Sequence, residues 1–231
     1  MKAPAIRRAL LEAAFVIVGI LVAFSIDAWW DDRQEMEVHD AVLASLANEI
    51  ARNQELVASD TEIAGRHLEL IDRFLRATPE ELATLPNDTL MRSFMNAFGN
   101  PVTHDPETAV ARMLMQRPAR DADGLRVQEE TGRWLRIISD SEEQAEALWT
   151  LAVEAWPAFA RNSLPYASDG LASMTWMNAR VSPQGLGQIR ANPELTARII
   201  AKGQMQGNYR RQLRFSAALL DSLAVIVADA R

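Results

Sequence analysis

Hydrophobic positions form one long uninterrupted stretch near the N-terminus. The segment Ala13–Ile26, AAFVIVGILVAFSI, contains no charged residue. Residues 9–30 number 22, and as a helix they would rise about 33 Å, enough to cross a hydrocarbon core of about 30 Å. Trp29 and Trp30 end the stretch, at the level where an interfacial aromatic belt would lie. The pattern predicts a transmembrane helix over residues 9–30.

Charged residues differ on the two sides of this stretch. Lys2, Arg7 and Arg8 precede it, and acidic residues follow Trp30. Because basic flanks stay in the cytoplasm, we expect residues 1–8 to form a cytoplasmic stub and residues 31–231 to lie in a bacterial periplasm. A cleaved export signal and a buried soluble helix are the alternatives. Glu12 and the length of the stretch favour a retained single-pass anchor in the inner membrane.

Six residues in or beside the predicted span are candidates for contact with the membrane or with a partner helix. Gly19 and Ala23 form a small-residue pair four positions apart, which can seat a neighbouring helix. Glu12 either pairs with Arg8 one turn earlier or makes a polar contact with a partner helix. The full candidate set is Glu12, Gly19, Ala23, Asp27, Trp29 and Trp30.

Proline positions divide the rest of the chain into helices. A capping residue stands directly before proline at Thr78-Pro79, Asp105-Pro106, Ser182-Pro183 and Asn192-Pro193. Proline fits the first helical turn because its missing N–H needs no partner there. We predict helices over residues 79–84, 88–98, 106–116, 125–160 and 193–228, with residues 163–183 irregular. The prediction is an all-α fold in which residues 31–231 form one helical domain.

The segment after the predicted span carries a heptad pattern and is predicted to continue as helix to residue 77. Apolar residues recur every seven positions, at Met36, Leu43, Ile50, Val57, Ala64 and Ile71. The second seam position holds His39, Leu46, Asn53, Asp60, His67 and Phe74. Four of these six are polar, which argues against a long two-stranded coiled coil and favours a helix lying on an elongated bundle.

Composition agrees with a helical protein and restricts its chemistry. Ala, Leu, Glu and Arg are abundant, and all are strong helix formers. The net charge is −7, and because residues 1–30 carry +1, the remainder carries −8. Nucleic acid is therefore not an expected partner. The chain has no cysteine, which excludes disulfides, thiolate chemistry and cysteine-ligated metals.

The N-terminal stretch GILVAFSIDAWWDDR, preceded by a glutamate, resembles the signature of a bacterial family of unknown function. Members show a span ending in Gly-Ile-Leu-Ile-Ala, then an isoleucine, a tryptophan and acids with arginine. The matching residues are Glu12, Gly19, Ile20, Leu21, Val22, Ala23, Ile26, Trp29, Asp31 and Arg33. The segment NPELTARIIAKGQMQGNYRRQL resembles the family's Asn-Pro-Glu-Leu helix start. The resemblance implies an anchored helical domain and brings no activity, cofactor or site.

Catalytic and cofactor-binding motifs are missing from the sequence. It has no HExxH, GxSxG, Walker loop or dinucleotide fingerprint, so we expect no cofactor and no metal. His104 and Glu107 flank Asp105 in what could be a ligand cluster, but Asp105 is better explained as a helix N-cap. The densest basic patch, predicted to face the acidic stretches 129–130 and 141–146, is Arg210, Arg211 and Arg214.

Aromatic and methionine side chains gather around the irregular region 163–183. They are Trp149, Trp156, Tyr166, Met174, Trp176 and Met177. Packing of a loop against helices is one explanation, and a ligand-binding or partner surface is the other, since these residue types are enriched in both.

These observations favour a non-catalytic, membrane-anchored interaction or scaffold protein. It would be an accessory subunit of a larger inner-membrane complex or a homo-oligomer, in contact with the lipid bilayer. The alternative is a periplasmic ligand-binding or sensory module around residues 163–183. Eight cytoplasmic residues cannot house an output domain, so such a module would act through a partner. An enzyme comes third, because the sequence offers no convincing acid–base pair.

Overall fold

The computed structural model describes residues 3–78, 81, 98–99, 102–163 and 183–231. Within those ranges, the side chains of residues 3–14, 156–163 and 183–186 are not described. The described part is all-helical. Three long helices dominate it: α1 (Ala3–Arg76), α5 (Ala122–Ser163) and α7 (Pro193–Asp229). Two short helices accompany them, α4 (Ala109–Met115) and α6 (Pro183–Ala191). The predicted all-α class is therefore confirmed.

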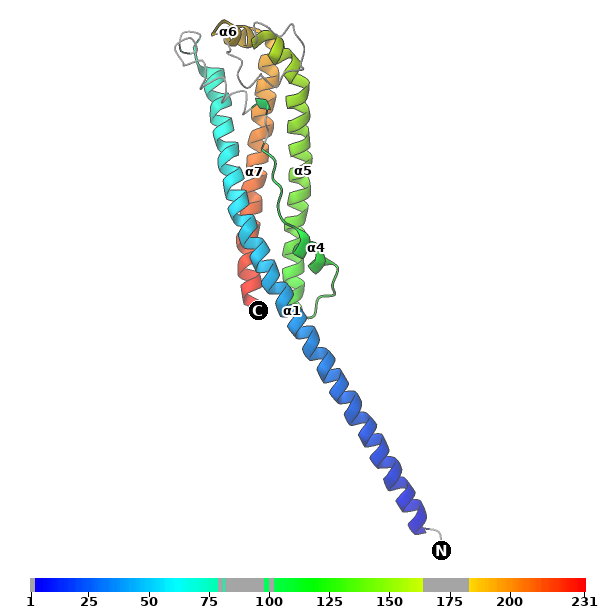
Figure 1. Cartoon of the computed structure of the whole chain (residues 1–231). Helices are drawn as coiled ribbons and strands as arrows, with labels where there is room; N and C mark the ends of the chain where they lie inside the picture. Colours follow the sequence, from blue (N-terminus) through cyan, green and yellow to red (C-terminus); the bar gives the residue numbers. More distant parts are fainter. Residues whose placement is uncertain (1–2, 79–80, 82–97, 100–101, 164–182) are drawn as a thin grey trace.

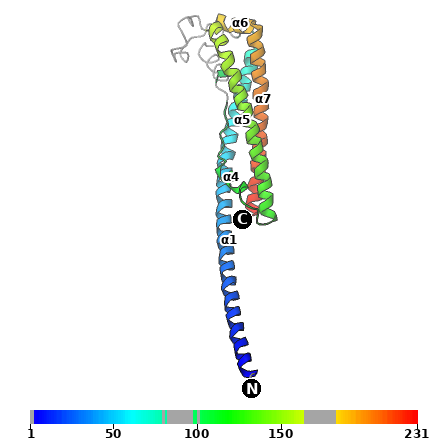
Figure 2. The same ribbon diagram turned by 90° about the vertical axis from the view of Figure 1, so that its right-hand side faces the viewer.

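The three long helices lie side by side as a bundle, with α7 antiparallel to α1 and α5 (Figures 1 and 2). Two contacts mark the register of α1 against α7. Gln54 donates a hydrogen bond to Asp221 at 2.7 Å. Further along, a Cβ placed on Gly203 would lie 3.3 Å from Ile71 Cγ2. From the first contact to the second, the residue number increases along α1, from 54 to 71, and decreases along α7, from 221 to 203. The two helices are therefore antiparallel.

Buried residues on all three long helices follow the alternating four- and three-residue spacing of a coiled-coil seam. In α1 they include Leu43, Leu46, Ile50, Asn53, Val57, Asp60, Ala64, Ile71 and Phe74. In α5 they are Val127, Thr131, Trp134, Ile138, Ser141, Leu148, Ala152 and Ala155. In α7 the residues that follow this spacing are Leu195, Ile199, Lys202, Gln206, Tyr209, Leu213, Ser216, Leu220, Leu223 and Val227, and Ile226 is buried beside them. The core is therefore a three-helix bundle in which several seam positions are polar.

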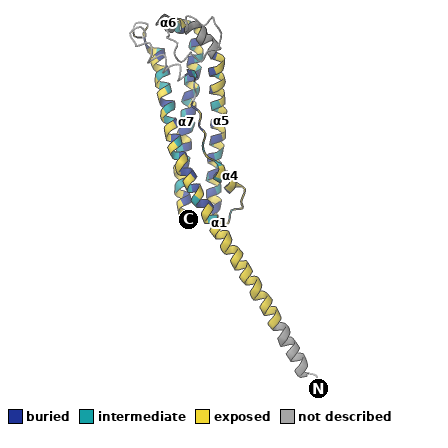
Figure 3. Cartoon of the chain, viewed as in Figure 1, coloured by how far each residue is buried: buried dark blue, intermediate teal, exposed yellow. Residues whose placement is uncertain are grey.

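The N-terminal part of α1 leaves the bundle as a free helix (Figure 3). Residues 15–38 are all exposed, and Val42 is the first buried residue of the chain's described part. We call residues 3–41 the stalk. Arg120, in the connection between α4 and α5, forms an ion pair with Asp32 and so ties the bundle to the stalk.

The predicted transmembrane helix over residues 9–30 lies within this stalk. The backbone is helical throughout that range, as expected. A search of the described residues found no helix with the combined length and apolarity needed to cross a membrane. The side chains of residues 9–14, including Glu12, lie outside the described ones.

Two of the four residues predicted to cap a helix before proline, Asn192 and Thr78, make capping hydrogen bonds. Asn192 caps α7 as expected, because its Oδ1 accepts hydrogen bonds from the backbone N–H groups of Glu194 and Leu195. Thr78 and Glu81 form a reciprocal capping box. Most of the helices predicted over 79–84 and 88–98 lies outside the described residues. The short helix α6 was not predicted.

The predicted helix over residues 106–116 is wrong at its start. The helix there is α4, which begins at Ala109, so Asp105 is not its N-cap. Residues 102–108 are instead extended along the bundle. The cap comes from another helix, because the Glu49 carboxylate of α1 accepts hydrogen bonds from the N–H groups of Val110 and Ala111. A carboxylate is favourable at that position since the helix N-terminus is electropositive.

Candidate functional site

The extended segment 102–108 is held in the bundle by polar side chains from the α1 seam. Asn53 binds both backbone groups of Glu107: its Oδ1 accepts from the N–H at 2.9 Å and its Nδ2 donates to the C=O at 2.7 Å. Arg52 adds an exposed ion pair to the Glu107 carboxylate at 2.6 Å. This pairing satisfies the backbone N–H and C=O of Glu107 in place of a neighbouring helix or strand.

A buried cluster lies further along the same segment. His104 Nδ1 is 2.7 Å from Asp60 Oδ2, and both side chains are almost fully buried. The backbone N–H of His104 donates to the hydroxyl of Tyr209 at 2.8 Å. Burial and the nearby Asp60 carboxylate raise the pKa of Tyr209 to about 12. Among the described residues, the Nε2 atom of His104 has no hydrogen-bond partner, so the Asp60 contact is made through Nδ1 alone.

The α7 seam contains a second polar group at two consecutive core positions. Lys202 and Gln206 are both fully buried. The Lys202 ammonium makes no hydrogen bond to the described residues and lies over the Phe98 ring, with Nζ 5.8 Å from the centroid. Both polar atoms of the Gln206 amide also lack a partner. Burial lowers the pKa of Lys202 to about 8, because the charged form is poorly solvated there.

His67 and Arg210 extend this group toward α1. Burial and the positive charge of Lys202 lower the pKa of His67, and its Nδ1 has no hydrogen-bond partner. The guanidinium of Arg210 lies over Gly65, where an added Cβ would come within 2.7 Å of its Nη2. The Nε of Arg210 is buried without a partner. These side chains form a polar group with net positive charge between α1 and α7.

Several of the candidates in the predicted span are exposed residues of the stalk. Gly19 has open space around its Cα, since an added Cβ would meet nothing within 4 Å. Ala23 and Asp27 are likewise exposed. Trp29 and Trp30 pack against each other in a tilted arrangement, with ring centroids 6.2 Å apart. The side chain of Glu12 lies outside the described residues.

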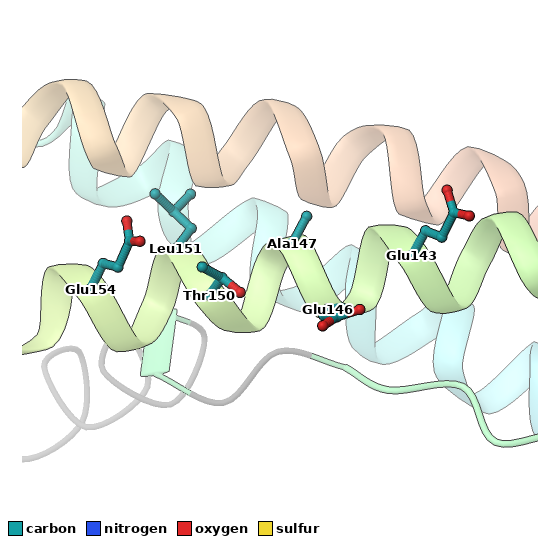
Figure 4. Close-up of a pocket in the computed structure, with 6 residues that line it drawn as sticks. All are labelled: Glu143, Glu146, Ala147, Thr150, Leu151 and Glu154. Carbon is teal, nitrogen blue, oxygen red and sulfur yellow. The ribbon is translucent and has the colours of Figure 1, made fainter.

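The aromatic and methionine candidates are described only at Trp149, which is 51% exposed on α5. The other five, whose side chains lie outside the described part of the chain, are Trp156, Tyr166, Met174, Trp176 and Met177. Near Trp149, α5 carries a shallow, open groove lined by Glu143, Glu146, Ala147, Thr150, Leu151 and Glu154 (Figure 4). All six residues come from one helix, and the groove encloses no convergent set of polar groups.

The contacts that the described residues make with the basic patch are not to the acidic stretches predicted to face it. Arg210 packs on α1, and Arg211 hydrogen-bonds to Asn208 one turn earlier on its own helix. Among the described residues, neither these two arginines nor Arg214 forms an ion pair with residues 129–130 or 141–146. Within the same described ranges, no group of three or more histidine and carboxylate side chains is placed to hold a metal ion.

Comparison with protein-family models, with curated proteins and with solved structures gave no match. The resemblance of the N-terminal stretch to a bacterial family therefore stays a prediction. Inferences about function rest on the chain's own geometry.

The polar core residues were visible in the sequence, but their role was not. Asn53, Asp60 and His67 stand at the second seam position, where they counted only against a two-stranded coil. Lys202 is one of two lysines in a chain whose other basic side chains are mostly arginine. It falls on the heptad that contains Tyr209 and Leu213, which is the signal that could have marked it as a core residue.

Proposed function

We propose that this protein is a membrane-anchored, non-catalytic interaction or scaffold protein, whose helical bundle is held at the bacterial inner membrane by the stalk. Residues 9–30 would enter the bilayer, residues 1–8 would stay in the cytoplasm and the bundle would stand in the periplasm. In this role it would act as an accessory subunit of a larger membrane complex or as a homo-oligomer.

The observation that carries this proposal is the exposure of the stalk. Nine large apolar side chains, on all sides of the helix, are between 50% and 76% exposed: Phe15, Val16, Ile17, Val18, Ile20, Leu21, Val22, Phe24 and Ile26. A helix that is apolar all round is found in a protein core or in a membrane, and this one leaves the bundle. Removing nine such side chains from water is worth on the order of 10 kcal/mol.

Charge and aromatic residues support an insertion depth that ends near Trp30. Trp29 and Trp30 would lie at the headgroup level, and Asp32 with its partner Arg120 directly beyond it. The bundle would then stand close to the membrane surface, with the connection between α4 and α5 as its nearest described part. The basic residues at positions 2, 7 and 8 would lie on the opposite, cytoplasmic side.

Membrane extraction tests the anchor. Ile20→Asp with Phe24→Asp places two charges on the exposed apolar stalk, and we expect this variant to be released from membranes by alkaline carbonate, which the unmodified chain resists. Met36→Asp with Val38→Asp is the matched control, because these residues are exposed on the same helix beyond Trp30. Equal release of the unmodified chain and of both variants would contradict the anchor.

Topology and partnership need separate measurements. A reporter enzyme active only in the periplasm should work at the C-terminus and not at the N-terminus, and activity at the N-terminus would reverse the proposed orientation.

Native mass spectrometry of the protein extracted from its own membranes should then show a stoichiometric partner or a second copy. Glu12→Gln should weaken that assembly if Glu12 contacts a partner helix. A monomer in every detergent tested would remove the scaffold role.

A further inference from the structure

Lys202 and Gln206 occupy positions in the bundle core that ordinarily hold apolar residues. They follow Ile199 and precede Tyr209 on the same buried stripe of α7, spaced three and four residues apart. Both side chains are fully buried, so bulk water does not solvate them. A charged ammonium and a primary amide at adjacent core positions require partners, because each buried unsatisfied polar group costs about 1–3 kcal/mol and a charge costs more.

The described residues around them supply no hydrogen-bond acceptor or carboxylate. Within the described part of the chain, the Lys202 Nζ and both polar atoms of Gln206 have no hydrogen bond, and Lys202 Nζ lies only over the Phe98 ring. Lys202 and Gln206 do not bind each other, although they are one turn apart. The two buried carboxylates of the described core are bonded elsewhere, Asp60 to His104 and Glu49 to the backbone of Val110 and Ala111. His67, whose pKa the charge of Lys202 lowers, and Arg210, which lies over Gly65 of α1, each have a buried nitrogen without a hydrogen-bond partner among the described residues, and neither brings a negative charge.

Register specification is one role for a polar residue in such a seam, since a single buried lysine or asparagine selects one helix alignment. That role requires the polar residue to find a partner in the correct alignment. In this bundle Asn53 and Asp60 meet the requirement, because each is bonded to segment 102–108. Lys202 and Gln206 do not, so register alone does not account for them.

We propose that Lys202 and Gln206 form an internal binding site for a small oxyanion, of the class of inorganic phosphate or the carboxylate of a small organic acid. The Lys202 ammonium would neutralise the anion and donate up to three hydrogen bonds, and the Gln206 amide would donate from Nε2. An unsatisfied group of this kind in a folded core is commonly explained by a bound ion or water. The site lies within the bundle, so it does not depend on the membrane anchor.

Two glycines keep one side of α7 free of side chains next to this site. Gly203 lies against Ile71 of α1, and an added Cβ there would have to displace the Ile71 methyl group. Gly207 follows one turn later, directly after Gln206, and an added Cβ would meet no atom within 4 Å. Gly207 therefore leaves open space on α7 next to the position of Gln206.

The titration of Lys202 is the first test, and the chain is suited to it because its only lysines are Lys2 and Lys202. The full chain, labelled with ¹³C,¹⁵N-lysine and kept in detergent, gives two side-chain signals, and Lys2→Arg assigns them. In sodium chloride alone we expect Lys202 to titrate near pH 8. Phosphate or acetate at matched ionic strength should raise that value by at least one unit, because the anion binds the protonated amine.

Comparison of the Lys202 titration in chloride, in phosphate and in acetate distinguishes the possible classes of anion. A shift with phosphate alone assigns a phosphate-type ligand, and a shift with acetate alone assigns a carboxylate. An equal shift on adding more sodium chloride indicates screening and an adventitious ion only, which overturns the proposal. An ordinary lysine value of about 10.5 before any addition also overturns it, since another group of the chain then already neutralises Lys202.

Thermal unfolding of variants gives a second readout. Lys202→Met keeps the side-chain length and removes the unpaired charge, so in chloride it should unfold at a higher temperature than the unmodified chain. The binding anion should raise the melting temperature of the unmodified chain by about 2–5 °C at ten times its dissociation constant and leave Lys202→Met unchanged. Gln206→Leu, which retains the lysine, should weaken the apparent affinity at least several-fold.

Gln54→Leu is the matched control, because Gln54 bonds Asp221 at the exposed side of the same two helices. It should leave the response to the anion unchanged. If Gln206→Leu and Gln54→Leu respond alike, or if Lys202→Met keeps the full response, the anion does not bind at Lys202 and Gln206 and the proposal fails.

Discussion

Asn53→Ala detaches the extended segment 102–108 from α1 without touching the apolar core. Asn53 makes two hydrogen bonds of 2.7 and 2.9 Å to the backbone of Glu107, and no other described side chain satisfies that N–H and C=O. Each lost bond costs about 1 kcal/mol net, and the groups left behind are half-buried and only in part rehydrated. We expect a destabilisation of about 2–3 kcal/mol, a large fraction of the 5–15 kcal/mol typical of a folded domain.

Hydrogen exchange of the full chain, followed by mass spectrometry, localises that loss. The amide of Glu107 is bonded to Asn53, and those of Val110 and Ala111 in the first turn of α4 are bonded to Glu49, so these three amides should be protected from exchange although none has a partner in its own helix. Since 1.4 kcal/mol corresponds to a factor of ten, Asn53→Ala should raise the exchange rate of the Glu107 amide about 30- to 150-fold. Peptides within α5 should change much less.

Ser45→Ala is the control, because the Ser45 hydroxyl is exposed and bonds only the carbonyl of Ala41 on its own helix. Its effect should stay within about 0.5 kcal/mol. If the Glu107 amide exchanges as fast in the unmodified chain as in an unstructured peptide, segment 102–108 is not held by Asn53 and the reasoning is refuted.

Three further outcomes follow from the core contacts. Tyr209→Phe leaves the buried N–H of His104 without a partner and should cost about 1–3 kcal/mol in urea unfolding. Burial raises the pKa of Tyr209 to about 12, so the folded state holds the phenol proton more tightly than the unfolded state does. The free energy of unfolding should therefore be constant below pH 10 and fall between pH 10 and 12. Tyr209→Phe, which has no phenol proton, should not show this fall. Asn192→Ala removes the cap from Glu194 and Leu195 and should lower stability by about 1 kcal/mol, measured by the same unfolding assay; no loss would contradict the capping role.

The sequence was informative about the fold where the pattern repeats along one helix. The last helix was predicted to end near residue 228 and ends at Asp229, and Tyr209, Leu213 and Leu220, which share one face of that helix by their spacing, are buried. The helix predicted over 125–160 is α5, which is longer by three residues at each end. Heptad periodicity and capping residues are local signals, so they can be interpreted without knowing the neighbours.

Contacts between distant segments could not be predicted in the same way. The bond from Asn53 to Glu107 joins residues 54 positions apart, and that from Tyr209 to His104 spans 105. The sequence shows that Asn53 and Asp60 are polar at seam positions, but not which backbone will lie against them. Asp105 was misinterpreted for the same reason: the cap of α4 is Glu49, on another helix. That Lys202 is buried without a hydrogen bond to any described residue likewise emerges only from the packing.

The polar seam residues also bear on how the stalk is held. A bundle built on heptads has competing alignments seven residues, or about 10.5 Å, apart along each helix, and apolar layers distinguish them poorly. Asn53 and Asp60 differ in their partners, so a slip of α1 by one heptad would leave both unsatisfied in the core. One alignment is thereby selected. Because α1 is a single helix from Ala3 to Arg76, that alignment also fixes which residue leaves the bundle, and Arg120 meets Asp32 only when it is correct. The residues that hold segment 102–108 therefore also set the position of the stalk.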